Sequence, residues 1–391
     1  MNEALILLDI TIVLLLAKVL EEVMARIKQP TILGDLLAGI IVGPTVFGLV
    51  SSVKNIESFA WVGIVILLFL GGVESSISEF KRYGMQVLVV ALGGVLACFL
   101  LGFSYAYMLG YDLKTMLFLG AILTPTSVGV TLRTLMDLNL LHTKEGRVIL
   151  GAAVADDIYS VIALALVYSL AMENKVTLES LSPILIGLAT IMTLTFLINK
   201  FSHEISIMLR KLKVHESAFT TMLIMGLAAA TLTAFFRLSP LVGAFFIGLA
   251  LSSIPGVELL RERLEFLSMI ITPIFFVYAG ILLNPWEVVS NNNLYEILCI
   301  GLSIAALGVI GKIIGCGLAA KLSGMNWNES LAVGLGMMPR AGVDLVIAVI
   351  GLSIGAITQE LYFGALLLIY FSSLTTPVLL KRAFKYRIHK S

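Results

Sequence analysis

The chain has 391 residues, of which 59% are hydrophobic and only 13% are charged, and its formal net charge is +1. A soluble domain carries about twice that share of charged residues, so water is not the main solvent of this chain. The net charge says little about partners, and we expect no nucleic acid among them.

Apolar runs long enough to cross a membrane recur along the whole chain. A spanning helix needs about 20 mainly apolar residues, and an open sheet in lipid would leave backbone groups unsatisfied. We therefore predict an all-α, polytopic membrane protein with about thirteen transmembrane helices. The predicted spans are 4–24, 31–50, 57–74, 85–110, 115–135, 147–171, 180–200, 217–236, 239–254, 265–284, 294–321, 327–355 and 360–380.

The basic residues predict the orientation of these spans. With the N-terminus outside, nineteen of the 26 Lys and Arg residues fall in loops or a tail assigned to the cytoplasm, four fall outside, and three fall within helices. Cytoplasmic loops carry such an excess of Lys and Arg. We expect a multi-pass protein of the inner cell membrane, in contact with the lipid bilayer, with a cytoplasmic C-terminus.

The fifth and twelfth predicted spans are both interrupted near mid-membrane. Pro125 is followed by the hydroxyl residues Thr126 and Ser127, and Pro339 is followed by Arg340. Proline removes a helical hydrogen bond, and neighbouring glycines and hydroxyls permit unwinding. The breaks are seven spans apart, so the two helices run in opposite directions. Matched breaks in inverted halves indicate a transporter site; two ordinary proline kinks are the alternative.

Ionisable residues lie at one depth in two of the spans. Asp156 and Asp157 fall in the sixth span, and Asp156 is nine residues from Arg147 at the cytoplasmic end. Lys312 in the eleventh span is nine residues from Lys321. Nine residues of helix rise about 14 Å, which is near the midplane. Intramembrane charges are costly and therefore functional candidates, so an Asp–Lys pair is expected.

The two aspartates are expected to differ in role. Adjacent helix positions point about 100° apart, so one carboxylate can pair with Lys312 while the other faces an aqueous cavity. A partly buried carboxylate can exchange a proton for a cation near neutral pH, and oxygen ligands suit sodium. The hydroxyls of Thr126 and Ser127 are expected to complete the coordination. Alternatively, the acids merely join helices through polar contacts.

Arg340 and Asp344 flank the second break at a spacing of four residues. This spacing places two side chains on one helix face, so we expect a structural ion pair that holds the unwound backbone. Direct cation binding is the weaker alternative, because an arginine would repel sodium.

Six segments follow a pattern known from other proteins: 28–44, 67–74, 155–157, 239–245, 273–276 and 336–340. Together they resemble the second branch of the monovalent cation:proton antiporters, which contains Kef-like and Nap-like proteins. The resemblance covers nearly the whole chain. One departure is that Ala341, Gly342, Val343 and Asp344 follow Pro339-Arg340, where the family often has Gly-Glu.

The resemblance implies a homodimer that works by alternating access, with a mobile core moving against a scaffold. The core would comprise residues 85–171 and 294–380, the scaffold and dimerisation part would comprise residues 4–74 and 217–284, and residues 180–200 would link them. In the manner of electrogenic members, Asp157 would bind Na⁺ and the proton, and Asp156 would pair with Lys312. Pro125 and Pro339 would be structural. No cofactor is implied.

The expected function is electrogenic sodium/proton antiport, with cytoplasmic Na⁺ (or Li⁺ or K⁺) exchanged for external H⁺. A potassium/proton antiporter or Kef-like potassium efflux protein is the alternative, although such proteins usually carry a cytoplasmic nucleotide-binding domain, and no Gly-rich strand–helix segment follows Leu380. A membrane-embedded enzyme with metal-binding aspartates would need a second acidic cluster for magnesium, so we expect no enzyme. A solute symporter on the same fold is a further alternative.

Overall fold

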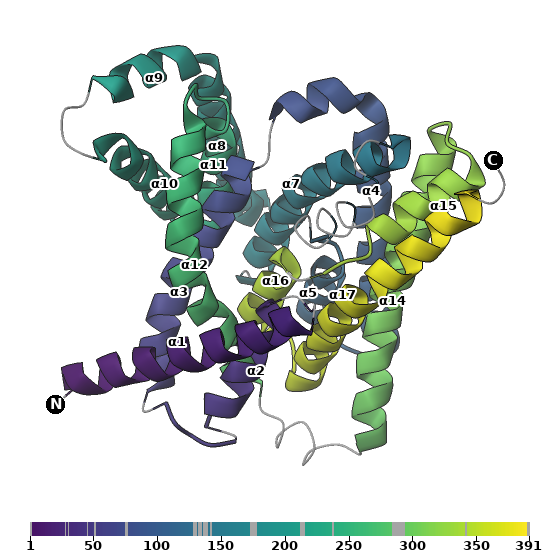
Figure 1. Cartoon of the computed structure of the whole chain (residues 1–391), viewed down its shortest axis with the longest axis horizontal. Coiled ribbons are helices and arrows are strands. Elements are labelled where there is room, and N and C mark those ends of the chain that lie inside the picture. The colour runs from purple at the N-terminus through teal and green to yellow at the C-terminus, as the bar shows by residue number, and fades with distance from the viewer. Residues whose placement is uncertain are drawn as a thin grey trace. The chain divides into compact units, whose positions relative to one another are not determined.

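The computed structural model is built of helices, as the sequence predicts. In the residues it describes, it contains fifteen α-helices and no strand (Figure 1). The described residues are 2–27, 29, 31–44, 46–50, 52–74, 77–127, 131, 135, 140, 143–172, 178–211, 216–236, 238–283, 294–340 and 342–388. The helices are α1 (Asn2–Arg26), α2 (Ile32–Val42), α3 (Val53–Glu74), α4 (Ile77–Met108), α5 (Leu113–Ile122), α7 (Lys144–Met172), α8 (Leu178–Lys200), α9 (Ser202–Arg210), α10 (Ser217–Phe235), α11 (Pro240–Leu251), α12 (Val257–Leu282), α14 (Leu294–Leu322), α15 (Trp327–Gly336), α16 (Val343–Ser353) and α17 (Gln359–Ile388).

The structure describes fewer long apolar helices than the thirteen predicted spans. Among the described residues, seven helices are long and apolar enough to span a membrane, and α8 with α9, bent by 71°, makes an eighth. Four apolar helices, α2, α5, α11 and α16, have only ten to twelve residues. The all-α membrane fold is confirmed, whereas the exact count of thirteen is not.

Local sequence features explain three details of the helices. The connection between the predicted spans 180–200 and 217–236 contains α9, a short amphipathic helix. The second predicted span ends early because Gly43 and Pro44 follow α2, and the residue before a proline disfavours helix. Helix α4 begins at Ile77 and kinks at Gly84, where φ is +71°, a value that glycine adopts without strain.

The chain folds into two compact units that each combine distant segments. Residues 20–34, predicted as part of the scaffold, group with the second unit, and the predicted linker 180–200 groups with the first. The roles of scaffold, linker and mobile core stay predictions. The first unit comprises residues 1–19, 35–78 and 164–280, and the second comprises residues 20–34, 79–163 and 281–391.

The first unit is organised around α11. This helix is buried along its whole length from Leu241 to Leu251, and it packs against α3, α8 and α10. A short helix surrounded by other helices can be apolar on every side. The approach of α3 is close: a Cβ atom on Gly72 would collide with the backbone of Phe245. Small residues at such positions let helix backbones approach closely in membranes.

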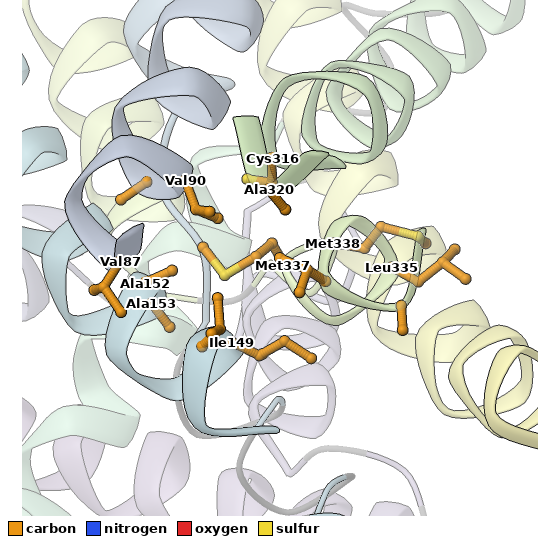
Figure 2. Close-up of a cluster of buried hydrophobic side chains, with 14 of the residues drawn as sticks. Val87, Val90, Ile149, Ala152, Ala153, Cys316, Ala320, Leu335, Met337 and Met338 are labelled. Atoms are coloured by element: carbon orange, nitrogen blue, oxygen red, sulfur yellow. The ribbon is translucent and has the colours of Figure 1, made fainter. Parts of the chain in front are cut away.

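The second unit contains both interrupted helices and the predicted charged residues. In it α14 packs against α15 and α17, and α16 packs against α5 and α17. A buried cluster joins four segments: Val87 and Val90 from α4, Ile149, Ala152 and Ala153 from α7, Cys316 and Ala320 from α14, and Leu335, Met337 and Met338 at the end of α15 (Figure 2). The many alanines bring α7 close to the second break.

Asp112 caps the N-terminus of α5, and this gives a prediction for acid stability. Its carboxylate accepts a hydrogen bond from the Thr115 N–H at 3.0 Å, and hydrogen bonds from Thr115 lower the pKa of the Asp112 carboxyl. A lowered folded-state pKa stabilises the protein above the unfolded-state pKa, and the contribution is lost as pH falls through the folded-state value. Asp112→Ala should lower the free energy of unfolding by about 1 kcal/mol at neutral pH.

The measurement is thermal unfolding in detergent between neutral pH and about pH 3, which crosses the usual aspartate pKa. The difference between wild type and Asp112→Ala should shrink below about pH 4, where the wild-type cap is lost through protonation. Asp112→Asn is the control, because asparagine caps equally well without a charge. A difference that stays constant across this range would contradict the charged cap.

Candidate functional site

Both predicted breaks lie where the sequence places a proline. Helix α5 ends at Ile122, and the backbone from Pro125 to Ser127 is not helical. Most of the second half of the predicted fifth span lies outside the described residues. Helix α15 ends at Gly336, and α16 begins at Val343. The second interruption is therefore complete, with a short helix on each side.

The two breaks are hydrogen-bonded to each other. The Ser127 N–H donates to the Pro339 carbonyl at 2.8 Å, and the Thr126 hydroxyl donates to the Met337 carbonyl at 3.0 Å. These bonds satisfy backbone groups that unwinding removes from the helices, which lipid could not satisfy. Thr126 is buried, and its oxygen retains lone pairs after donating its proton.

Arg340 is a fully buried link across the crossing of the two breaks. Its guanidinium donates to the Pro125 carbonyl, to the Gly308 carbonyl of α14 at 3.1 Å and to the Cys98 sulfur of α4 at 3.6 Å. The predicted ion pair with Asp344 stays a prediction. A guanidinium presents five donors in a planar fork, so it can join several acceptors on different segments.

Asp344 is buried in the first turn of α16. Its Oδ1 accepts a hydrogen bond from the Gly342 N–H at 2.8 Å. A carboxylate in the first turn also interacts favourably with the positive end of the helix dipole. The geometry therefore places Asp344 at the start of the half-helix, on the far side of the break from α15.

Asp156 and Lys312 form an ion pair inside the second unit. Both side chains are 0% exposed, and the Lys312 ammonium donates to Asp156 Oδ1. Thr126 lies beside the same carboxylate, and the charge of Arg340 acts on it. A buried carboxylate and ammonium are tolerated only when they are paired, because each alone would lose its hydration. The pair thus lies next to the first break.

Asp157 has a different environment from its neighbour. It is half-buried, whereas Asp156 is fully buried. Because consecutive residues on a helix point about 100° apart, Asp157 cannot share the direction that Asp156 takes toward Lys312. The structure brings Asp156, Lys312 and Thr126 together, with Ser127 and Asp157 as their neighbours in sequence.

The described residues can be compared with the needs of a metal site that uses several side-chain ligands. Within the part that the structure describes, no three His, Cys, Asp or Glu side chains gather closely enough to hold a metal ion. A divalent metal site of the kind used in catalysis usually needs several such ligands. A transported monovalent ion makes no such demand, since backbone carbonyls, hydroxyls and one carboxylate can coordinate it.

Nearly the whole chain matches the sequence model of one protein family. Residues 11–385 match the model of the family described as sodium/hydrogen exchanger, transmembrane. The chain belongs to the sodium/hydrogen exchanger family. The predicted resemblance to cation:proton antiporters is thereby confirmed, and the protein is a multi-pass membrane antiporter rather than an enzyme.

Two relatives of this exchanger come from Bacillus cereus. The chain is 31% identical to the probable Na⁺/H⁺ antiporter GerT, over 96% of this chain and 98% of the relative. It is 30% identical to the Na⁺/H⁺-K⁺ antiporter GerN, over 96% of this chain and 95% of the relative. Relatives of this exchanger therefore include antiporters named for sodium and for potassium.

A solved structure has the same fold as this exchanger. The sodium proton antiporter MjNhaP1 from Methanocaldococcus jannaschii matches with a TM-score of 0.72, covering 98% of each chain. The sequence identity is 17%, so the match concerns the fold alone.

Sequence reasoning missed two groups at the exchanger's crossing. Ser372 and Ser373 of α17 hold the backbone of Arg340: the Arg340 N–H donates to Ser372 Oγ at 3.2 Å, and the Ser373 hydroxyl donates to the Arg340 carbonyl at 2.7 Å. The available signal was the polar pair Ser372-Ser373, followed by Thr375-Thr376, inside the mainly apolar last span. The second missed contact joins Arg340 to the Pro125 carbonyl. These residues are far apart in the chain, so no spacing pattern predicts their contact.

The contacts of Arg340 predict a structural role in the exchanger. Arg340→Lys should lower the free energy of unfolding by about 1–3 kcal/mol, because a single ammonium cannot replace the guanidinium fork and leaves a buried carbonyl unsatisfied. Thermal unfolding in detergent measures this. Arg261→Lys is the matched control, since Arg261 is 54% exposed in its pairs with Glu74 and Glu265. Equal unfolding midpoints for both variants would contradict the role.

Proposed function

We propose that the chain exchanges sodium for protons across the membrane, with Asp157 as the site that both ions occupy in turn. The observation that carries the proposal is the difference between two adjacent aspartates on α7. Asp156 is fully buried and neutralised by Lys312, whereas Asp157 is half-buried. We therefore assign the exchanged ions to Asp157 rather than to Asp156.

Competition for one carboxylate is sufficient to couple the two fluxes. A carboxylate oxygen is a hard ligand of the kind that sodium prefers, and it binds either the cation or the proton. If Asp157 faces each side of the membrane only when it is occupied, protons entering drive sodium out. We propose that Thr126 and Ser127, beside the first break, supply further oxygen ligands.

The interrupted helices support this assignment physically. Helix ends near mid-membrane present partial charges and backbone groups to an ion, which continuous helices cannot do. The bonds from Thr126 to Met337 and from Ser127 to Pro339 hold the two breaks against each other. A site built beside this crossing would move with it as one body, so the ion would keep its ligands during transport.

We also propose that the exchange is electrogenic. Exchange at Asp157 alone would move one proton for each sodium ion and no net charge, so we propose that the Asp156–Lys312 pair carries a second proton: Lys312 releases a proton when sodium binds at Asp157 and takes one up when sodium leaves. One net charge crossing 100 mV is worth about 2.3 kcal/mol, so the membrane potential would help to drive sodium export.

The proposed setting is the inner cell membrane, with the N-terminus outside and the C-terminus in the cytoplasm. The positive-inside distribution of Lys and Arg supports this orientation. We propose a homodimer as the assembly. Reporter fusions at the two termini distinguish the two orientations. A reporter that is active only in the periplasm, if active at the C-terminus, would contradict the proposed orientation.

The test is cation-dependent proton flux in proteoliposomes that contain the purified chain. Sodium, lithium, potassium and choline chlorides are added in turn, with the membrane potential clamped at zero or left free. We expect sodium to evoke proton flux that changes with potential, while choline evokes none. A proton flux independent of all cations would refute antiport.

Potassium is the alternative cation, because the relative GerN is named as a Na⁺/H⁺-K⁺ antiporter. The same proteoliposomes decide between the ions. Potassium-coupled flux larger than sodium-coupled flux would make the chain a potassium/proton antiporter. Equal flux at clamped and free potential would contradict the electrogenic part of the proposal while leaving exchange itself intact.

A further inference from the structure

A groove lies on the second unit between α14 and α15. Its volume is about 210 Å³, and its lining is almost entirely apolar. Ile314, Leu318 and Leu331 are each about half exposed there. On a chain that crosses a membrane, exposed apolar side chains of this kind meet lipid tails. The lining residues are Ile313, Ile314, Gly317, Leu318, Trp327, Ser330 and Leu331.

One end of the groove is basic and aromatic. The Lys321 ammonium lies 5.4 Å from the centre of the Trp327 ring, and Lys321 has no ion pair within the described residues. The acid nearest in sequence to Trp327, Glu329, has its carboxylate 3.1 Å from the Lys144 ammonium. Lysine and tryptophan together are typical of the level of lipid headgroups. The mouth of the groove therefore favours an anion.

A buried hydroxyl on the groove wall has no partner. Ser330 is 1% exposed and lines the groove, yet its Oγ makes no hydrogen bond to any described group. Buried polar groups in proteins are nearly always hydrogen-bonded, so each exception needs an explanation. An acceptor held in the groove would satisfy this hydroxyl.

The basic end, the buried hydroxyl and the apolar lining of the groove lie in the same order as the phosphate, ester and acyl chain of a phospholipid. Ser330 is three residues after Trp327 on α15, a rise of about 4.5 Å, and Ile313 is eight residues before Lys321 on α14, a rise of about 12 Å. An anion-binding end, a buried hydroxyl and an apolar channel match a phosphate, an ester carbonyl and an acyl chain. A free phosphate would use only the first of these.

We propose that this groove binds one anionic phospholipid. Its phosphate contacts Lys321 and the indole N–H of Trp327, an ester carbonyl accepts the hydrogen bond of Ser330, and one acyl chain lies along α14 between Leu318 and Ile313. Because α15 leads directly to the second break, the bound lipid holds the half-helix against α14 beside Gly317, where an added Cβ atom would lie 3.3 Å from the Ser330 carbonyl oxygen.

Native mass spectrometry of the delipidated protein, titrated with phosphatidylglycerol or phosphatidylcholine, tests the proposal. Wild type should bind phosphatidylglycerol about fivefold more tightly than phosphatidylcholine, the preference that one lysine near an anionic headgroup provides. Lys321→Gln should remove this preference, and Leu331→Trp should fill the groove and remove the bound lipid. Lys381→Gln and Leu302→Trp are matched controls, on α17 and on α14 outside the groove.

The outcomes separate the groove from ordinary surface lipid. Unchanged lipid binding in both Lys321→Gln and Leu331→Trp would overturn the proposal, and so would equal losses in the controls. Glycerol phosphate competing as well as the phospholipid would show a phosphate site instead. If Leu331→Trp does not fold, Ser330→Ala replaces it, and a several-fold loss of affinity for both lipids is expected because both carry ester carbonyls.

Discussion

Replacing Asp157 with asparagine is expected to abolish sodium-dependent proton flux while leaving the protein folded. Asparagine keeps the size of the side chain but neither binds a proton nor carries a charge at any working pH. If Asp157 is the shared site, the variant loses both ions at once. Flux in proteoliposomes gives the activity, and gel filtration with thermal unfolding in detergent gives the fold.

Asp112→Asn is the control for the loss of one acid, because Asp112 lies outside the helices at the start of α5 and asparagine also caps a helix. It should retain wild-type flux. Asp157→Glu keeps the carboxylate and should retain part of the exchange with a changed affinity for sodium. Wild-type flux in Asp157→Asn would make Asp157 structural and remove the proposed site.

Breaking the Asp156–Lys312 ion pair is expected to have the largest effect on stability. Asp156→Asn leaves a buried ammonium, and Lys312→Met leaves a buried carboxylate, and each should cost about 3–5 kcal/mol of unfolding free energy. The double variant buries no charge and should be close to wild type in stability, since a neutral pair of similar volume is often as stable as an ion pair.

Thermal unfolding of the two single variants and the double variant in detergent measures this coupling. The exposed pair Arg261–Glu265 provides the control, and its single variants should cost about 0–1 kcal/mol. Additive losses in the double variant would contradict a direct pair. The double variant also separates stability from function. If it is stable but its sodium-dependent proton flux responds differently to membrane potential, the pair takes part in the electrogenic cycle.

Much of the candidate site could be predicted because membrane insertion makes charges informative. Asp156 and Lys312 each lie nine residues from the predicted cytoplasmic end of their span, at Arg147 and Lys321, so equal depth indicated a pair. Pro125 and Pro339 marked the two interruptions, because proline in a helix interior removes a hydrogen bond. These signals are local in sequence or depend only on distance along a helix.

The remaining features depend on tertiary packing. The spacing of Arg340 and Asp344 favours an ion pair on a continuous helix, but the helix is broken between them, so the spacing rule does not apply. Arg340 reaches Pro125 and Gly308, which are far away in sequence. The partnerless hydroxyl of Ser330 likewise appears only when α14 and α15 are packed together.

The number of complete spans was poorly predicted where burial replaces membrane thickness. Helix α11 is apolar throughout but has only twelve residues, because protein surrounds it on the sides that lipid would otherwise occupy. Composition alone cannot distinguish a buried short helix from half of a spanning helix. For this reason the prediction of apolar helices is confirmed, whereas the predicted number of spans is not.

Proton release on sodium binding is the most direct test of the central claim, that Asp157 holds either a proton or a sodium ion. Purified protein in weakly buffered detergent solution receives sodium chloride, and a pH indicator dye records released protons, with choline chloride as the blank. The account predicts sodium-dependent release from wild type and from the Asp156→Asn, Lys312→Met double variant, and none from Asp157→Asn. Undiminished release from Asp157→Asn would contradict it.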